Sequence, residues 1–356
     1  MLNCLKALFF IIILSCVKCS PKQEIRNNTQ VKKKSDVRFL TINEGALAIL
    51  DETYEPYFSN LQIREIHTLT GVLPPTKNID SARTFAREKF SSAVTAFTKK
   101  EQTILQHVIS VVKDTFERNN LNIIANHPWK LIKIEDWLCG GFAHTRGDYI
   151  ILSQRHLNHL TSFWSEKMSH TDSVLIVKKL GSLLAHEQFH SLQRKYPKKF
   201  ESLYVESWDF KKAHIEIDSA IIINQLTNPD APKAEWITNR NGNYYWARTL
   251  INEHSINPKM GEDFIDVVFT LNQNGNHFSI AKDTLNNPKT QRLFELTSYT
   301  NSFPVTQGLD HPNEISAYMF SKYFEALIER RKPFDNTTKK ATLFSQKYLT
   351  WIKNNF

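Results

Sequence analysis

Two histidines and a glutamate in one stretch of the chain could hold a metal ion and act on a water beside it. In LLAHEQFHSLQRKYP, residues 183–197, His186 and His190 stand four positions apart. On a helix this spacing turns both imidazoles toward one point, where a zinc ion is the simplest shared partner. Glu187 projects beside such an ion, where a general base would stand. The alternative is that both histidines are hydrogen-bonded members of an ordinary buried helix.

A catalytic zinc site needs a third protein ligand and keeps a fourth position for water. A longer motif with Gly and His after these histidines is absent, because Gln193 and Tyr196 stand at those positions. The candidates near in sequence are Glu201, Glu206, His214 and Glu216. Glu314 is distant, but Pro312 and Asn313 before it predict a helix start that would hold it rigidly in the first turn. We therefore expect Glu314 to complete the site.

The helix that begins at Pro312 carries further candidates. Small Ala317 and Ser321 would let it approach the histidine helix closely, and Glu325 on the same stripe could orient a ligand histidine. A hydrolytic site also needs a group that stabilises an oxyanion. The candidates are His277, Tyr299, His311 and Tyr318, and the sequence does not choose among them.

The elements that must position these residues follow from periodicity and from chain breakers. Residues 173–196 predict a helix with apolar side chains around most of its circumference, so it should be buried, and Pro197 ends it. Residues 139–153, CGGFAHTRGDYIILS, predict two short strands that turn at Arg146-Gly147. We interpret Arg146-Gly147-Asp148 as this turn and not as an integrin-binding tripeptide, and Cys139 as a core thiol and not as a nucleophile.

Three stretches together resemble the zincin-type zinc metallopeptidases whose third ligand is a glutamate downstream of His-Glu-x-x-His (gluzincin-like). They are LLAHEQFHSLQRKYP, HPNEISAYMF at 311–320 and GGFAHTRGDYIILS at 140–153, and uncharacterised bacterial lipoproteins are similar in the same three stretches. The resemblance implies a helix-rich α+β fold with a small mixed or antiparallel sheet. The edge strand of that sheet precedes the active-site helix and receives a peptide as an added strand.

The same resemblance implies a metallopeptidase in which His186, His190 and Glu314 hold Zn²⁺ and Glu187 is the general base. Residues 39–127 are then a helical N-terminal region, with a capping box from Thr98 to Glu101, and residues 128–356 are the catalytic region. The segment between His190 and Glu314 is longer than in typical members. We interpret its strands, at about 215–310, as a β-rich insertion.

The composition fits a soluble globular protein and argues against nucleic-acid binding. The chain has 356 residues, of which 41% are hydrophobic and 23% charged, and its formal net charge is +9. The lysines are scattered and form no basic stripe interleaved with aromatics. We therefore expect a peptide or protein substrate. The alternative is a non-catalytic surface lipoprotein with a structural zinc site or an adhesive role, which a fourth protein ligand would favour.

The first residues predict export. In MLNCLKALFFIIILSC, residues 1–16, the apolar run from Ala7 to Leu14 is too short to span a bilayer and is typical of a secretory signal. Ile13-Leu14-Ser15-Cys16 resembles the bacterial lipoprotein box. We expect a signal peptide over 1–15, a flexible polar tether over 16–38, and lipid on Cys16 that anchors the protein to a bacterial membrane, periplasmic or at the cell surface. A plain signal peptide with incidental cysteines is the alternative.

Replacement of Cys16 tests the anchor. The variant Cys16→Ala should lose its partitioning into the detergent phase and should not be cut to the wild-type mature size, because the lipidated residue is gone. Cys19→Ala is the matched control and should behave as wild type. Unchanged processing and membrane partitioning of Cys16→Ala would show that this cysteine carries no lipid.

Overall fold

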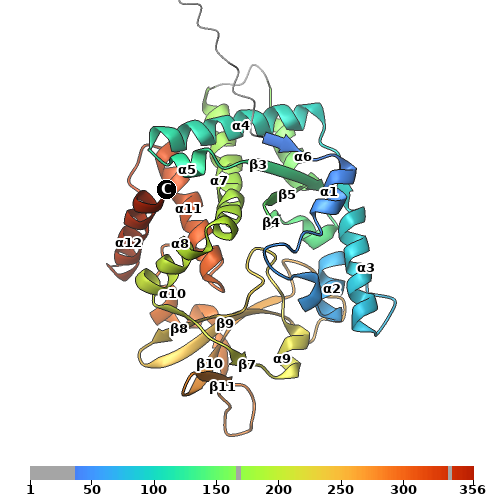
Figure 1. Cartoon of the computed structure of the whole chain (residues 1–356), viewed down its shortest axis with the longest axis vertical. Coiled ribbons are helices and arrows are strands. Elements are labelled where there is room, and N and C mark those ends of the chain that lie inside the picture. Colours follow the sequence, from blue (N-terminus) through green and yellow to red (C-terminus); the bar gives the residue numbers. More distant parts are fainter. Residues whose placement is uncertain (1–36, 166–169, 336–338) are drawn as a thin grey trace, which may run out of the picture. The chain divides into compact units, whose positions relative to one another are not determined.

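Helices and strands combine in an α+β architecture with two separate sheets (Figure 1). The computed structural model describes residues 37–165, 170–335 and 339–356, which belong to one compact unit. The expected signal peptide, Cys16 and the tether up to residue 36 lie outside the described residues. Within the described ranges, no helix combines the length and the apolarity that crossing a membrane requires.

The first sheet is mixed and has five strands in the order β1-β3-β5-β4, with β2 also paired to β3. Its strands are β1 (Val37–Phe39), β2 (Val94–Thr95), β3 (Trp129–Ile134), β4 (His144–Arg146) and β5 (Tyr149–Ser153). β3 runs parallel to β1 and β5, whereas the β4–β5 and β2–β3 pairs are antiparallel. β4 therefore lies at an edge of the sheet and comes before the histidine helix, and the predicted pair of strands that turn at Arg146-Gly147 is present.

The start of the first sheet corrects one boundary. The tether was expected to run to residue 38, but Val37 and Arg38 belong to β1 and pair with Trp129 and Lys130. The next residue, Phe39, packs its ring 5.1 Å from the ring of Phe97. This contact gives the start of the fold a partly buried apolar anchor, which is preceded by charged residues in the sequence.

The hairpin from β4 to β5 turns at Gly147, whose φ of +57° suits a residue without a side chain. Arg146 is buried, and its guanidinium lies 4.1 Å from the centre of the Tyr57 ring. The Arg-Gly-Asp tripeptide thus serves the turn and the core, because its arginine is not presented to solvent.

Three long helices build the main core against this sheet (Figure 1). They are α4 (Lys99–Arg118), α7 (His170–Lys195) and α11 (Pro312–Ile328). The predicted capping box of Thr98 and Glu101 begins α4. α7 lies between its two neighbours, and Gly181 makes this possible: a Cβ there would stand 2.8 Å from Phe324 and 3.2 Å from Val112. Phe189 stacks on Phe320 of α11 with a centroid distance of 4.3 Å.

The other helices complete the unit. Three of them pack with β2, β3 and β5 in a second core, and these are α1 (Ile42–Ala48), α2 (Ile63–Thr70) and α3 (Ile79–Ser92). The others are α5 (Asn122–Ala125), α6 (Gln154–Phe163), α8 (Pro197–Ser202), α9 (Ser219–Asn224), α10 (Thr297–Thr300) and α12 (Lys339–Asn355). Residues 37–127 therefore contribute two strands and several helices to the body that also holds α7.

The second sheet has seven strands and occupies the segment between α8 and α11. Its strands are β6 (Phe210–Lys212), β7 (Ile215–Glu216), β8 (Trp236–Arg240), β9 (Asn243–Ile251), β10 (Phe264–Asn274), β11 (His277–Ile280) and β12 (Thr290–Arg292). Trp246, Phe269 and Phe278 lie in its own apolar cluster. The long connection from α9 to β8 leaves this sheet and passes the first sheet at β4.

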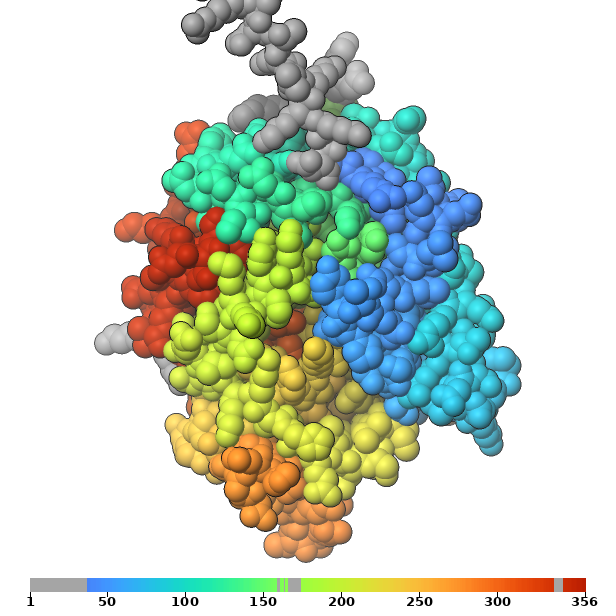
Figure 2. Space-filling model, viewed as in Figure 1, coloured from blue at the N-terminus to red at the C-terminus, as the bar shows by residue number. Residues whose placement is uncertain are grey.

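Contacts tie the N-terminal helices to the second sheet. Arg64 on α2 donates from Nη2 to the carbonyls of Asn252 and Ser255 at 2.7 and 2.6 Å. In Figure 2 the side chains of the N-terminal segment, in blue, lie against those of the yellow segments near α9. The two sheets are therefore linked through α2 as well as along the chain.

Substitution of Gly181 tests the packing of α7 against α11. Gly181→Ala should lower the free energy of unfolding by about 1–3 kcal/mol, measured by urea denaturation, because the added methyl overlaps Phe324. Phe324→Leu removes the ring atoms that the methyl would meet. The double variant should therefore be less destabilised than the sum of the two singles by about 0.5–3 kcal/mol. Strict additivity would argue against this contact.

Candidate metal centre

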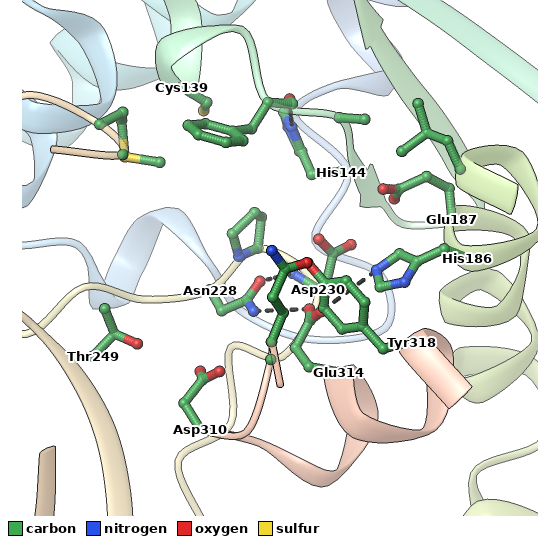
Figure 3. A pocket seen from close by; sticks show the side chains of 18 of the residues that line it. Cys139, His144, His186, Glu187, Asn228, Asp230, Thr249, Asp310, Glu314 and Tyr318 are labelled. Carbon is green, nitrogen blue, oxygen red and sulfur yellow. Dashed lines mark hydrogen bonds and ion pairs between the residues drawn. The ribbon is translucent and has the colours of Figure 1, made fainter. Parts of the chain in front are cut away.

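Three side chains that can each offer a metal-ligating atom converge where α7 faces the start of α11 (Figure 3). The Nε2 atoms of His186 and His190 are 3.1 Å apart. The Glu314 carboxylate oxygens lie 3.4 Å from Nε2 of His186 and 3.5 Å from Nε2 of His190. All three residues are buried. This group could bind a metal ion.

The start of α11 holds Glu314 in place. Pro312 is the first residue of the helix, and the His311 Nδ1 atom accepts a hydrogen bond of 3.1 Å from the Asn313 backbone N–H. This is the helix start that the sequence predicted. The His311 Nε2–H donates to the Lys233 carbonyl at 3.1 Å, so the cap is itself fixed.

Gln193 fixes the tautomer of His190. Its amide nitrogen donates to the Asn313 carbonyl at 2.8 Å, and a carbonyl can only accept. Its Oε1 atom must therefore face His190 Nδ1, 2.8 Å away, and Nδ1 must carry the proton. This leaves the lone pair of His190 on Nε2, the atom that faces His186 and Glu314. Gln193 is thus the partner that orients a histidine of this group.

Glu325 does not take that role, contrary to expectation. Its carboxylate lies 3.2 Å from Nζ of Lys322 and 4.0 Å from Nη2 of Arg331. The prediction that Glu325 and Glu314 share one face of α11 agrees with the structure, because both residues line the same cavity. Nearby cations, however, hold its carboxylate away from the imidazoles.

Electrostatics couple the three members of the group. Burial acts to lower the pKa of His186, but its hydrogen bond and charge interaction with Glu314 raise that pKa to about 9. Burial also lowers the pKa of His190, to about 3. For Glu314 burial favours the neutral acid, yet the two histidines hold its pKa down at about 2. In the absence of a metal, His186 and Glu314 therefore form a buried ion pair.

Glu187 stands beside this group and outside it. Its Oε2 atom accepts a hydrogen bond of 2.9 Å from Thr145 Oγ1 on β4. Burial, and then the charge of Asp230, raise the pKa of Glu187 to about 8. A carboxyl with such a pKa can take up and release a proton near neutral pH.

Two residues from the connection between α9 and β8 reach the centre, and they were not among the predicted site residues. Asn228 Nδ2 donates to Glu314 Oε1 at 2.8 Å. Asp230 Oδ1 accepts from the Thr145 backbone N–H at 2.6 Å. Burial, and then Glu314, raise the pKa of Asp230 to about 6. The only available signal was an Asn-Pro-Asp turn, which many loops contain.

A cavity of about 610 Å³ opens beside the centre. His186, Glu187 and Glu314 line it, together with Asp230 and Tyr318. Among the sequence candidates for an oxyanion donor, Tyr318 is the one that lines this cavity, and its ring centre lies 4.5 Å from that of His186.

The remaining candidates lie elsewhere. Tyr299 donates its hydroxyl to the Leu309 carbonyl, His277 is exposed on β11, and His311 caps α11. Glu201 forms an ion pair with Lys212. Glu201, Glu206, His214 and Glu216 are not members of the group around His186. Cys139 is buried in the second core, and burial raises the pKa of its thiol to about 12, so it is no ready nucleophile.

The fold and the centre define an α+β protein with a buried His-His-Glu group that could bind a metal ion. No protein-family model, curated protein or solved structure matches the chain. The chemistry of the centre must therefore follow from its own residues.

Removal of Glu314 tests the ligand set. Glu314→Ala should weaken Zn²⁺ binding by about 100-fold or more in a calorimetric titration, because the anionic ligand is lost. Glu206→Ala and Glu216→Ala are parallel controls and should bind as wild type. If Glu314→Ala kept wild-type affinity while either control lost it, the ligand would be one of the nearer carboxylates.

Proposed function

We propose that this chain is an exported zinc metallopeptidase of the zincin type, in which His186, His190 and Glu314 hold the ion and Glu187 is the general base. The observation that carries the proposal is the combination of a three-ligand triangle, one buried carboxylate beside it, and a cavity on which both open. The resemblance of the three sequence stretches to zincins agrees with this arrangement.

The dimensions of the triangle suit zinc. In tetrahedral sites zinc lies about 2.0–2.1 Å from histidine nitrogens and carboxylate oxygens, so neighbouring ligand atoms are separated by about 3.3 Å. Here the two Nε2 atoms are 3.1 Å apart, Glu314 Oε2 lies 3.4 Å from Nε2 of His186, and Glu314 Oε1 lies 3.5 Å from Nε2 of His190. With one ligand atom taken from each residue, the three atoms lie within 4.8 Å of one another. Two neutral imidazoles and one carboxylate are also a donor set that zinc accepts in catalytic sites.

An open fourth position separates an enzyme from a structural zinc site. In the ranges that the structure describes, the potential ligand group contains His186, His190 and Glu314 and no fourth His, Cys, Asp or Glu. His186 and Glu314 line the cavity, so substrate and water can approach from that side. This favours a hydrolase over the alternative of a surface lipoprotein with a closed zinc site.

The residues of the chain divide the work of hydrolysis. Bound zinc supplies Lewis acidity for the carbonyl and the attacking water. Glu187, held by Thr145, accepts a proton from that water and passes it to the leaving amine. The raised pKa of Glu187 matches this exchange near neutral pH. Tyr318, beside His186, is placed to donate its hydroxyl to the oxyanion.

The proposal also includes a zincin-like edge strand beside the active-site helix and a location at a bacterial membrane. β4 is an edge strand next to the helix that carries the histidines, which is the relation that the family resemblance implies. The lipid on Cys16 would tether the catalytic unit to a bacterial membrane, so that its substrates would be peptides or proteins outside the cytoplasm.

Removal of the general base tests the chemistry. Glu187→Gln should keep zinc occupancy near that of the wild type, while kcat for peptide hydrolysis should fall by about two or more orders of magnitude. Glu325→Gln removes a different carboxylate from the cavity and should retain activity. Wild-type turnover by Glu187→Gln would exclude Glu187 from catalysis, and loss of zinc would show that it is a ligand.

A further inference from the structure

The outer edge of β4 determines how a peptide can enter the cavity. In the β4–β5 pair, His144 and Arg146 stand opposite Ile151 and Tyr149, and Thr145 lies between them. The Thr145 backbone N–H and C=O point away from β5 and bond to side chains outside the sheet. These are the groups that an added substrate strand would use.

Side chains already occupy both groups. Asp230 Oδ1 accepts from the Thr145 N–H at 2.6 Å, and Arg194 Nη2 donates to the Thr145 carbonyl at 3.2 Å. Arg194 is held in turn by Glu55 at 3.0 Å and by the Pro229 carbonyl at 2.8 Å. A strand cannot be added at Thr145 while these contacts persist.

The segment that carries Asp230 is a fixed part of the wall. Thr227, Asp230 and Ala231 are exposed by 6% or less. The Thr227 N–H donates to Glu65, Asn228 donates to Glu314, and Arg194 donates to Pro229. Displacement of the segment would break all of these hydrogen bonds and leave buried polar groups unpaired. We therefore infer that this segment permanently blocks the addition of a peptide strand at Thr145 and does not open as a lid.

The residues just before β4 border the cavity. Ala143 lines the cavity, whereas Thr145 does not. A peptide can therefore lie along Phe142 and Ala143 but must end where Asp230 begins. The cavity accommodates one end of a chain at this point.

Charge decides which end that is. Five carboxyl groups line the cavity without a lysine or arginine among the lining residues to pair with them, from Glu187, Asp230, Asp266, Asp310 and Glu314; a sixth, from Glu325, is paired with Lys322. Lys322 is the single Lys or Arg among the lining residues, and it stands at the rim, half exposed and paired with Glu325. A free carboxylate end of a peptide would meet repulsion here, and an ammonium end would meet attraction.

His144 adds an acceptor to the same end. Its Nδ1–H donates to the Phe142 carbonyl at 3.1 Å, so Nε2 carries the lone pair. In the part of the chain that the structure describes, this buried Nε2 has no hydrogen-bond partner. Figure 3 shows His144, Glu187 and Asp230 directed toward the same space beside the metal ligands. His144 Nε2 lacks a donor, and the carboxylates of Glu187 and Asp230, which each accept one bond from Thr145, can accept more. These acceptors favour a ligand rich in N–H groups.

The direction of the strand agrees. A peptide with its amino end at Asp230 runs from the Thr145 side toward Ala143, which is antiparallel to β4. Antiparallel pairing is the slightly more stable arrangement. A peptide bound by its amino end therefore fits the block at Thr145, the acidic lining of the cavity and the direction of β4.

We propose that the site is that of an aminopeptidase, in which Asp230 binds the free α-ammonium group of a peptide and closes the cleft behind the first residue. This rests on the proposed function. Water adds across the first peptide bond: its hydroxyl goes to the carbonyl carbon, and its proton goes through Glu187 to the leaving nitrogen. The products are the amino-terminal residue and the shortened peptide.

The test compares a peptide set with free amino ends with the same set after N-acetylation, on the zinc-loaded full chain. The free set should have a kcat/KM at least about 100-fold higher, with products released from the amino end, because a charged group loses its buried partner on acetylation. Asp230→Asn keeps an acceptor for the Thr145 N–H but removes the charge. It should raise KM for the free set by about 10-fold or more and leave the acetylated set unchanged, whereas Glu325→Gln should keep the wild-type preference.

A binding measurement separates this inference from catalysis. An amino-acid hydroxamate with a free α-amino group should bind the zinc-loaded chain about 10-fold tighter than its N-acetylated form, and Asp230→Asn should abolish the difference. Internal cleavage of acetylated peptides at full rate, lost in Glu187→Gln, would overturn the aminopeptidase and retain the peptidase. A preference for the free hydroxamate without any cleavage would retain the ammonium site and overturn the hydrolase. No cleavage and no preference would overturn both.

Discussion

Glu314 brings a negative charge from one buried helix against two imidazoles of another, and the rest of the centre depends on this contact. Burial alone would favour the neutral acid, so the ionised carboxylate persists because His190 and His186 beside it, together with a hydrogen bond from Asn228, favour its charged form. The two helices can come this close because Gly181 leaves room for Phe324 and because Phe189 stacks on Phe320. Packing in the apolar core therefore sets the distances between the polar atoms.

The second sheet contributes to the centre through one connection and not through its own core. Part of the sheet forms an apolar cluster of its own, whereas Phe210, Trp236 and Val268 join the core that surrounds α7. The segment from Thr227 to Ala231 leaves that sheet, crosses to β4 and places Asn228 and Asp230 beside Glu314 and Thr145. A segment that looks like an insertion in the sequence thus becomes one wall of the site, and its carboxylate gives that wall its charge.

Much of the architecture was predictable because its signals are local. The hairpin of β4 and β5, the capping box at Thr98 and the helix start at Pro312 each depend on a few neighbouring residues. The two predictions that were wrong, the end of the tether and the role of Glu325, depend on tertiary contacts. Val37 and Arg38 join a strand because β3 pairs with them, and Glu325 turns away from the histidines because Lys322 and Arg331 hold it.

The sequence by itself determined the relation among His186, Glu187 and His190, since the pitch of a helix fixes which of them share a face. It also favoured Glu314 over nearer carboxylates, because Pro312 marks a rigid helix start. Only the tertiary structure decided that Gln193 sets the tautomer of His190, that Asp230 and Arg194 cap β4 at Thr145, and that Tyr318 and not His311 faces the cavity. These contacts join residues far apart in the chain, and their partners are selected by packing, which leaves no periodic or local pattern in the sequence.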